Sequence, residues 1–292
     1  MNYPLTFSPF TLSCRGQQKV FRRPLVMGIL NATDDSFYDG GKYNTPEALL
    51  TQARMLLGQG ADLLDLGVMS SRPGASMPTP QEETDRLVPL VKLLRSELPD
   101  AILSVDTCRS LAAAGAVEAG ADIINDISGG QLDPDMFTTV ASLHVPYILM
   151  HMRGTPATMQ LPENTRYNDI VDDLARYFDD KLNQLQRLGC NEVWLDPGLG
   201  FAKTTEQNHQ LLHRLPELIA RFPEHPMLVA LSNKSMITKQ LPPFPSPTTL
   251  ELPDSEFGTV ALNTVALMGG ASILRVHTPR PTRIAISLLF SQ

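Results

Sequence analysis

Three oxygen-bearing side chains stand where apolar runs of the sequence end. Asp106 follows ILSV, Asn125 follows DII, and Asp196 follows EVWL. Polar and charged side chains at the ends of buried strands are costly to bury without hydrogen-bond partners. Charge-assisted hydrogen bonds contribute roughly 1.5 to 3 kcal/mol each, so two carboxylates and an amide suit a flat heterocycle that carries NH and NH2 donors. Taken singly, each residue is also explained by helix capping or loop hydrogen bonding.

Basic residues follow other apolar runs of the chain. Arg72 comes after the second run, and Arg275 and His277 close the last one. Parallel barrels often hold phosphate beyond their last strands, so we expect these residues to bind phosphate or diphosphate. A solvated charge at Arg72 and a loop or core histidine at His277 are the alternatives. Lys234 is interpreted as a hydrogen-bond donor, a phosphate counter-charge or a Schiff-base amine.

The segment DPGLGF, which contains Gly198 and Gly200, resembles a loop that cradles phosphate. Such a glycine pattern is weak when it stands alone. Tight packing of the backbone explains both glycines equally well.

The first of these apolar runs leads into a polar loop. The stretch 26–41, VMGILNATDDSFYDGG, reads as a buried strand that breaks at Asn31. Rigid strands commonly fix the groups that such loops present. The stretch therefore predicts one edge of a binding site.

Eight apolar runs alternate with eight amphipathic segments, and these elements must position the polar groups. The apolar runs cover 25–30, 62–66, 101–105, 123–125, 147–150, 192–195, 227–231 and 272–276. The helical segments cover 46–59, 80–98, 109–119, 134–142, 168–189, 205–221, 258–268 and 281–290. Strict βα alternation requires a parallel sheet, and eight units close naturally into a (β/α)8 TIM barrel. A doubly wound open sheet is the alternative, although no GxGxxG follows the first strand.

Capping signals support these helix boundaries. Thr45, Thr79 and Asp133 each precede a proline at a predicted helix start. Glycines 60, 120 and 189 fall where helices should end. Residues 1–23 are expected to form a short hairpin or arm, with a plausible turn at Cys14–Gln18, before an α/β barrel over 24–292. The Pro-rich segment 241–256 is expected to be a surface loop, a lid or an interface.

Composition excludes several classes of protein. The 292 residues carry a formal net charge of −7 and no Lys/Arg run, which argues against a nucleic-acid partner. Three scattered cysteines without metal-ligand spacing indicate a reducing compartment. Neither a signal peptide nor a membrane span is evident, so we expect a cytoplasmic protein.

Eight short motifs in order resemble the dihydropteroate synthase family. They are MGILNATDDSFYDGG, SSRPGA, SVDT, GADIINDISGG, MHMRGTPATMQ, DPGLGFAKT, SNKS and ALMGGASILRVH, between about residues 24 and 277. The resemblance implies a (β/α)8 barrel that condenses 6-hydroxymethyl-7,8-dihydropterin diphosphate with 4-aminobenzoate in folate biosynthesis, releasing pyrophosphate. It also implies that sulfonamides bind, that Mg2+ is required and that a homodimer is compatible with the fold.

The same resemblance assigns roles residue by residue. It implies pterin contacts from Asp106, Asn125, Met150, Asp196, Phe201 and Lys234. It implies diphosphate contacts from Asn31, Ser71, Arg72, Arg275 and His277, with Asn31 also the Mg2+ ligand. Phe37, Pro73 and Ser232 would border the aminobenzoate. Asp106, Lys234, Arg275 and His277 would be the catalytic set, in a reaction that resembles SN1 because diphosphate leaves before the amine attacks.

Several positions depart from the family pattern. Asn233 stands where the family has arginine, and Asp34 replaces a proline in the first loop. The sequence therefore also allows a catalytically weakened pterin-binding paralogue. A pterin-dependent methyltransferase of similar fold and an aldolase that uses Lys234 are the remaining alternatives.

Overall fold

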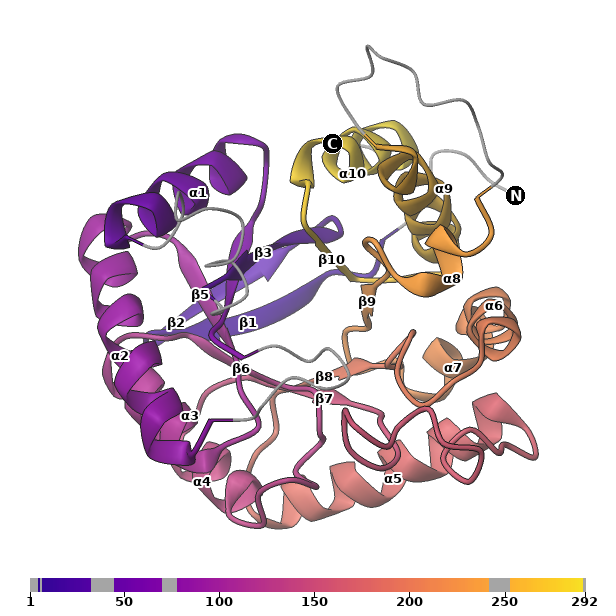
Figure 1. Cartoon of the computed structure of the whole chain (residues 1–292), viewed down its shortest axis with the longest axis horizontal. Coiled ribbons are helices and arrows are strands. Elements are labelled where there is room, and N and C mark those ends of the chain that lie inside the picture. The colour runs from indigo at the N-terminus through magenta and orange to yellow at the C-terminus, as the bar shows by residue number, and fades with distance from the viewer. Residues whose placement is uncertain (1–4, 6, 33–44, 70–77, 242–252, 291–292) are drawn as a thin grey trace.

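The computed structural model describes residues 5, 7–32, 45–69, 78–241 and 253–290. Eight parallel strands form a barrel whose hydrogen-bonded order is β8-β7-β6-β5-β4-β3-β10-β9 (Figure 1). The strands are β3 (Leu25–Asn31), β4 (Leu63–Gly67), β5 (Ile102–Asp106), β6 (Ile123–Asp126), β7 (Tyr147–Met150), β8 (Val193–Asp196), β9 (Leu228–Ala230) and β10 (Ile273–Val276). A parallel bridge between Leu195 and Met227 joins β8 to the start of β9 and closes the ring. The prediction of a TIM barrel is confirmed.

Helices surround the barrel on its outer side (Figure 1). They are α1 (Pro46–Gly58), α2 (Pro80–Glu97), α3 (Ser110–Glu118), α4 (Met136–Leu143), α5 (Ile170–Arg187), α6 (Thr205–His213), α7 (Leu215–Arg221), α8 (Ser235–Thr238), α9 (Asp254–Met268) and α10 (Pro279–Leu289). The expected helix at 205–221 is broken at Arg214, ahead of Pro216, because proline fits only the first turn of a new helix. The short α8 was not expected, and α9 begins four residues earlier than predicted.

Two of the three predicted helix caps are confirmed. The Thr45 side chain accepts a hydrogen bond from the Ala48 amide, and Thr79 forms a reciprocal capping box with Glu82. The third prediction is wrong in position, since the N-cap of α4 is Asp135 and not Asp133. The Asp133 Oδ1 accepts from the Asp135 amide at 3.0 Å in the turn before α4. Its Oδ2 accepts from the amide and hydroxyl of Ser110 at 2.7 and 2.9 Å, at the start of the neighbouring helix α3.

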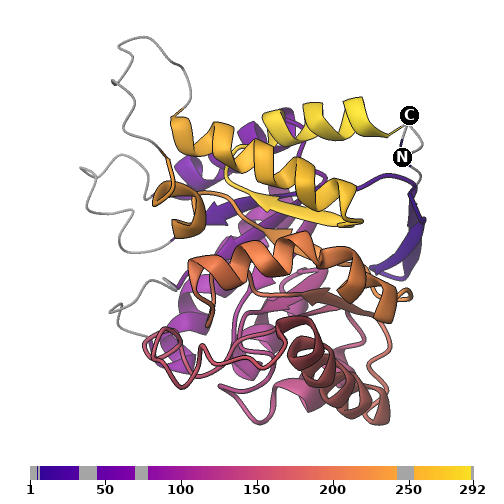
Figure 2. The same cartoon turned by 90° about the vertical axis from the view of Figure 1, so that its right-hand side faces the viewer.

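The amino-terminal segment forms the expected hairpin, β1 (Phe10–Cys14) and β2 (Gln17–Phe21). Its turn residues Arg15 and Gly16 both have positive φ, 49° and 76°, which matches the twist of a two-residue hairpin. Leu12 and Cys14 pack into an apolar cluster with Met27 and Trp194 inside the barrel. Figure 2 shows the hairpin at the end of the barrel away from α8, so it plugs the amino-terminal ends of the strands.

A second, larger apolar layer fills the space between the strands and the helices. Within the described residues, the hairpin covers one end of the barrel and leaves uncovered the other end, where the carboxyl ends of the strands lie (Figure 2). None of the described helices combines the length and apolar character that a membrane span requires.

Candidate functional site

Strand register places three predicted site residues, Asn31, Asp106 and Asn125, in one row with Gly67 at the open end of the barrel. Asn31 pairs with Gly67, Gly67 with Asp106, and Asp106 with Asn125. A Cβ atom on Gly67 would lie 3.5 Å from the Asp106 Cβ and 3.7 Å from the Asn31 Oδ1. The amide of Asn31 and the carboxylate of Asp106 therefore flank this glycine.

Arg275 joins two carboxylates at this row. Its Nε donates to Asp65 Oδ2 at 2.6 Å, and its Nη2 donates to Asp106 Oδ2 at 2.9 Å. Burial raises the pKa of Asp106 to about 7, although the Arg275 guanidinium opposes the shift, and the negative charge of Asp65 adds to it. Asp106 and Arg275, which were predicted to bind the pterin and the diphosphate respectively, are thus in direct contact, and carboxylates engage the Arg275 guanidinium.

Asp65 is a site residue that motif reading missed. It is fully buried within β4, and it accepts hydrogen bonds from Ser104, Asn125 and Arg275. The available signal was a carboxylate inside a predicted buried strand, since a buried charge requires partners.

Asp196 and Lys234 form the opposite side of the barrel mouth. Asp196 Oδ1 accepts from the Gly198 amide at 2.7 Å, and the Lys234 ammonium donates to the Leu199 carbonyl while lying 4.8 Å from the Phe201 ring centroid. Burial lowers the pKa of Lys234 to about 8, with Asp196 opposing the shift. Burial also raises the pKa of Asp196, and the Lys234 ammonium opposes that change.

An apolar wall lies beside these charges. Met150, at the end of β7, is buried in a cluster with Met152, Met159 and Ala202, and Phe201 packs against this cluster. The predicted packing pair Met150 and Phe201 is therefore brought together. Such a wall next to hydrogen-bond acceptors suits an aromatic ring with polar edges.

The glycines of DPGLGF serve tight packing. A Cβ on Gly198 would lie 2.1 Å from the His151 carbonyl oxygen, and one on Gly200 would lie 2.8 Å from the Lys234 Cδ. Their amides donate to Asp196 and Asn208. Both N–H groups therefore already have partners, Asp196 at the end of β8 and Asn208 in α6, and the structure favours tight packing as the role of the two glycines.

Ser232 and His277 are in contact although they were expected in different subsites. The Ser232 Oγ lies 2.9 Å from the His277 Nδ1. The next residue, Asn233, adopts a left-handed backbone with φ of 58°, and its Nδ2 donates to the buried Glu256 at 3.3 Å. A carboxylate therefore lies beside the position where the family has arginine.

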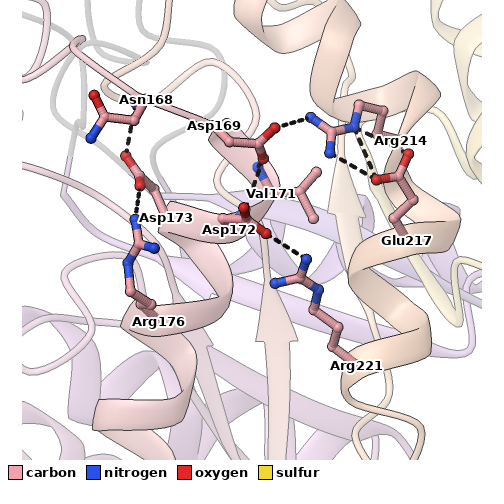
Figure 3. A network of polar contacts seen from close by, with 9 residues as sticks. All are labelled: Asn168, Asp169, Val171, Asp172, Asp173, Arg176, Arg214, Glu217 and Arg221. Carbon is pink, nitrogen blue, oxygen red and sulfur yellow. Dashed lines mark hydrogen bonds and ion pairs between the residues drawn. The ribbon is translucent and has the colours of Figure 1, made fainter.

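Two other strand-end groups belong to the scaffold. His151 is buried, and its Nδ1 lies 3.1 Å from the buried Lys203 Nζ, which also donates to the Gly198 carbonyl. Arg153 stacks on Tyr167 at 4.1 Å and pairs with Asp173. Figure 3 shows Asp173 within the polar network that ties the start of α5 to α6 and α7, in which Asp169 holds Arg214 and Asp172 holds Arg221.

Four predicted site residues lie outside the described residues: Phe37, Ser71, Arg72 and Pro73. The loop at 33–39 and most of the Pro-rich segment 241–256 lie outside them as well.

The metal prediction rests on Asn31 alone. Among the described residues, no three His, Cys, Asp or Glu side chains gather as a metal site. Mg2+ usually keeps waters and takes few protein ligands when substrate phosphates bind it. An exposed amide at the rim, as Asn31 provides, fits an ion that arrives with a diphosphate better than a resident metal.

Comparison with known proteins agrees with this geometry. The family model described as "Pterin binding enzyme" matches residues 27–277. The chain belongs to this family of pterin-binding enzymes. The dihydropteroate synthase of Synechocystis is 42% identical, with 88% of this chain and 86% of the relative covered. A mitochondrial folate synthesis bifunctional protein of Arabidopsis thaliana is 40% identical, and the chain spans 47% of its length.

Solved structures of the pterin-binding family share the fold. The Yersinia pestis dihydropteroate synthase in a sulfonamide drug complex has a TM-score of 0.84 at 38% identity, covering 96% of this chain and 97% of that chain. The Xanthomonas albilineans dihydropteroate synthase in complex with 7,8-dihydropteroate has a TM-score of 0.79 at 35% identity, covering 95% and 96%.

Proposed function

We propose that this chain is a dihydropteroate synthase, which joins 6-hydroxymethyl-7,8-dihydropterin diphosphate to 4-aminobenzoate and releases pyrophosphate. The observation that carries the proposal is the convergence of Asp106, Asn125 and Asp196 with Lys234 and Arg275 at the open end of the barrel. Relatives that match this chain over most of their length are named dihydropteroate synthase, and one solved structure of such an enzyme is in complex with 7,8-dihydropteroate.

The pterin would lie between the acceptors and the apolar wall. Asp106, Asn125 and Asp196 would accept hydrogen bonds from its NH and NH2 groups, and the Lys234 ammonium would donate to a ring acceptor. Met150 and Phe201 would pack on the ring. These contacts set the orientation of the ring, so its exocyclic carbon points toward the diphosphate residues.

The reaction would begin when the bond between that carbon and the diphosphate oxygen breaks. The electron pair leaves with the diphosphate, where Arg275, His277, Ser71 and Arg72 would balance the charge. The carboxylates of Asp106 and Asp196 favour the cation that develops on the pterin. The amine of 4-aminobenzoate, bordered by Phe37, Pro73 and Ser232, then forms the new C–N bond and gives up a proton to water.

Mg2+ would neutralise charge on the departing diphosphate, with Asn31 as its protein ligand. The exposed position of Asn31, beside Gly67 and near Asp106, supports this part of the proposal. A homodimer also stays a prediction, which sedimentation equilibrium would check.

A weakened pterin-binding paralogue is the second candidate, and Asn233 favours it. The deciding experiment measures pyrophosphate release from the pterin diphosphate with and without 4-aminobenzoate. We expect release that depends on 4-aminobenzoate, product identified as 7,8-dihydropteroate, and competition by a sulfonamide. A Lys234→Met variant is the control for contaminating activity. Binding of pterin without product formation by the wild type would favour the paralogue.

A further inference from the structure

Asp65 is a buried carboxylate at the centre of the site that no ligand contact explains. Its exposed fraction is 0%, so a ligand in the barrel mouth does not reach it. Ser104 donates to its Oδ1 at 2.6 Å, while Asn125 and Arg275 donate to its Oδ2 at 3.0 and 2.6 Å. Three donors on one carboxylate offset the cost of burying its charge.

We propose that Asp65 is the positioning residue of the pterin subsite, which fixes the amide of Asn125 and the guanidinium of Arg275 for substrate. This inference rests on the proposed function of the same site. Two of the residues that would touch substrate hydrogen-bond to the same oxygen atom of Asp65, although they come from β6 and β10 on different sides of β4.

The contact with Asp65 sets which way round the Asn125 amide stands. An ionised carboxylate only accepts hydrogen bonds, so it selects the NH2 group of the amide as its neighbour. The amide oxygen is then turned away from Asp65 and is left for a donor on the ligand. Asn125 is thereby specified as an acceptor, like Asp106 beside it.

The contact with Asp65 also holds Arg275 in place during an exchange of partners. Arg275 uses Nε for Asp65 and Nη2 for Asp106. When pterin donors occupy Asp106, Nη2 can turn to the diphosphate, and the bond from Nε to Asp65 keeps the guanidinium at the site. A guanidinium has five N–H donors, so the anchoring bond leaves others for an anion.

An Asp65→Asn variant tests this role without changing the size of the side chain. The new amide must place its own NH2 group toward either Ser104 or the Asn125 and Arg275 pair, which themselves donate. We expect kcat/KM to fall on the order of 100-fold, as for a misplaced binding group. Calorimetry should show weaker binding of pyrophosphate, which reports on Arg275, and of 6-hydroxymethylpterin, which reports on Asn125.

The matched control is Ser104→Ala, which removes one hydrogen bond from the other oxygen of the same carboxylate. We expect its melting temperature to fall by the loss of one buried hydrogen bond, while both probes bind within about 3-fold of wild type because Asp65 Oδ2 still holds Asn125 and Arg275. The proposal is overturned when Asp65→Asn binds both probes like wild type, or when Ser104→Ala weakens them equally.

A measurement on the wild type covers the case in which Asp65→Asn does not fold. Neutron diffraction of the complex with 6-hydroxymethylpterin locates the amide deuterons of Asn125. Deuterons directed at Asp65 support the proposal, and deuterons directed at the pterin overturn it. Neither the calorimetry nor the neutron diffraction requires turnover, so failure of this inference is distinct from failure of the synthase assay.

Discussion

The Ser232 hydroxyl and the His277 Nδ1 lie 2.9 Å apart, although 45 residues separate them in the chain. One was expected beside the aminobenzoate and the other beside the diphosphate. Ser232 follows β9 and His277 follows β10, and these two strands are hydrogen-bonded neighbours. The residues proposed for the two subsites therefore share a hydrogen bond, so in the proposed reaction the second substrate would bind next to a group that would hold the leaving diphosphate.

Ser232→Ala tests whether this contact orients His277. We expect the kcat/KM for the pterin diphosphate to fall roughly 3- to 10-fold, because one net hydrogen bond contributes about 0.5 to 1.5 kcal/mol. Steady-state kinetics with both substrates varied would measure the change. Ser287→Ala removes a hydroxyl from the outer helix α10 and should leave both constants unchanged. An unaltered pterin constant in Ser232→Ala would show that other contacts hold His277.

Asp106→Ala should have different effects on the binding of the pterin and on the binding of pyrophosphate. Loss of this acceptor should reduce pterin affinity at least 10-fold, since a hydrogen bond to a charged group contributes roughly 1.5 to 3 kcal/mol. The same change frees the Arg275 Nη2, so pyrophosphate binding should be retained or tightened. Calorimetry with each ligand gives both values. Asp135→Ala, at an exposed carboxylate before α4, is the control. Pterin affinity equal to wild type would contradict the pocket assignment.

The lowered pKa of Lys234 predicts that pterin affinity declines at alkaline pH. Its pKa in the ligand-free site is about 8 because burial disfavours the ammonium. The charged donor is present below that pH and is lost as the pH rises through it. Pterin binding should therefore weaken between about pH 7 and 9. Lys234→Arg keeps its charge over this range, so any binding that it retains should not show the decline. A flat wild-type profile would remove the ammonium from pterin recognition.

The sequence predicted the architecture because periodicity and capping act locally. Alternation of apolar runs with amphipathic segments located all eight barrel strands, and Thr45 and Thr79 marked helix starts that the structure shares. Asp133 was misassigned because it accepts locally only from the Asp135 amide, while its other oxygen is held by Ser110, which lies 23 residues earlier in the chain. A cap of that kind depends on the meeting of two loops, which no local pattern encodes.

The family motifs predicted which residues lie at the candidate site. They did not predict the contacts between residues that are far apart in the sequence. Register confirmed that Asp106 and Asn125 are adjacent, as their positions at neighbouring strand ends imply. Asp65 escaped notice because its partners Ser104, Asn125 and Arg275 lie 39, 60 and 210 residues away. The glycines of DPGLGF were ambiguous because their role depends on the His151 carbonyl and Lys234, which only the folded chain brings near.

Gly198→Ala should destabilise the protein far more than Gly16→Ala. Both glycines have positive φ, 65° and 76°, so both substitutions carry a similar backbone strain of about 1 kcal/mol. A Cβ at Gly198 would also meet the His151 carbonyl oxygen at 2.1 Å, whereas nothing lies within 4 Å of one at Gly16. We expect Gly198→Ala to lower the free energy of unfolding, measured in urea, by at least about 3 kcal/mol. Equal losses would show that the 198–203 loop moves aside readily.

Asn233→Arg tests one of the positions at which the sequence departs from the family pattern. Arginine at a φ of 58° costs about 1 kcal/mol relative to asparagine, which tolerates this conformation. The buried Glu256 that now accepts from Asn233 would become its counter-ion and offset that cost. We expect thermal stability close to wild type and a KM for 4-aminobenzoate lowered by about 10-fold or more, since a hydrogen bond to a charged group contributes roughly 1.5 to 3 kcal/mol.

The double variant Asn233→Arg/Glu256→Gln separates the two effects that the new arginine can have. Without the carboxylate of Glu256, the guanidinium is no longer tied to α9 and is available to the substrate. A further drop in the aminobenzoate KM, together with a lower melting temperature, would assign Glu256 as the group that restrains a cation at this position. If neither variant changes that constant, another group already supplies the positive charge that the substrate carboxylate requires, and Asn233 does not weaken the enzyme.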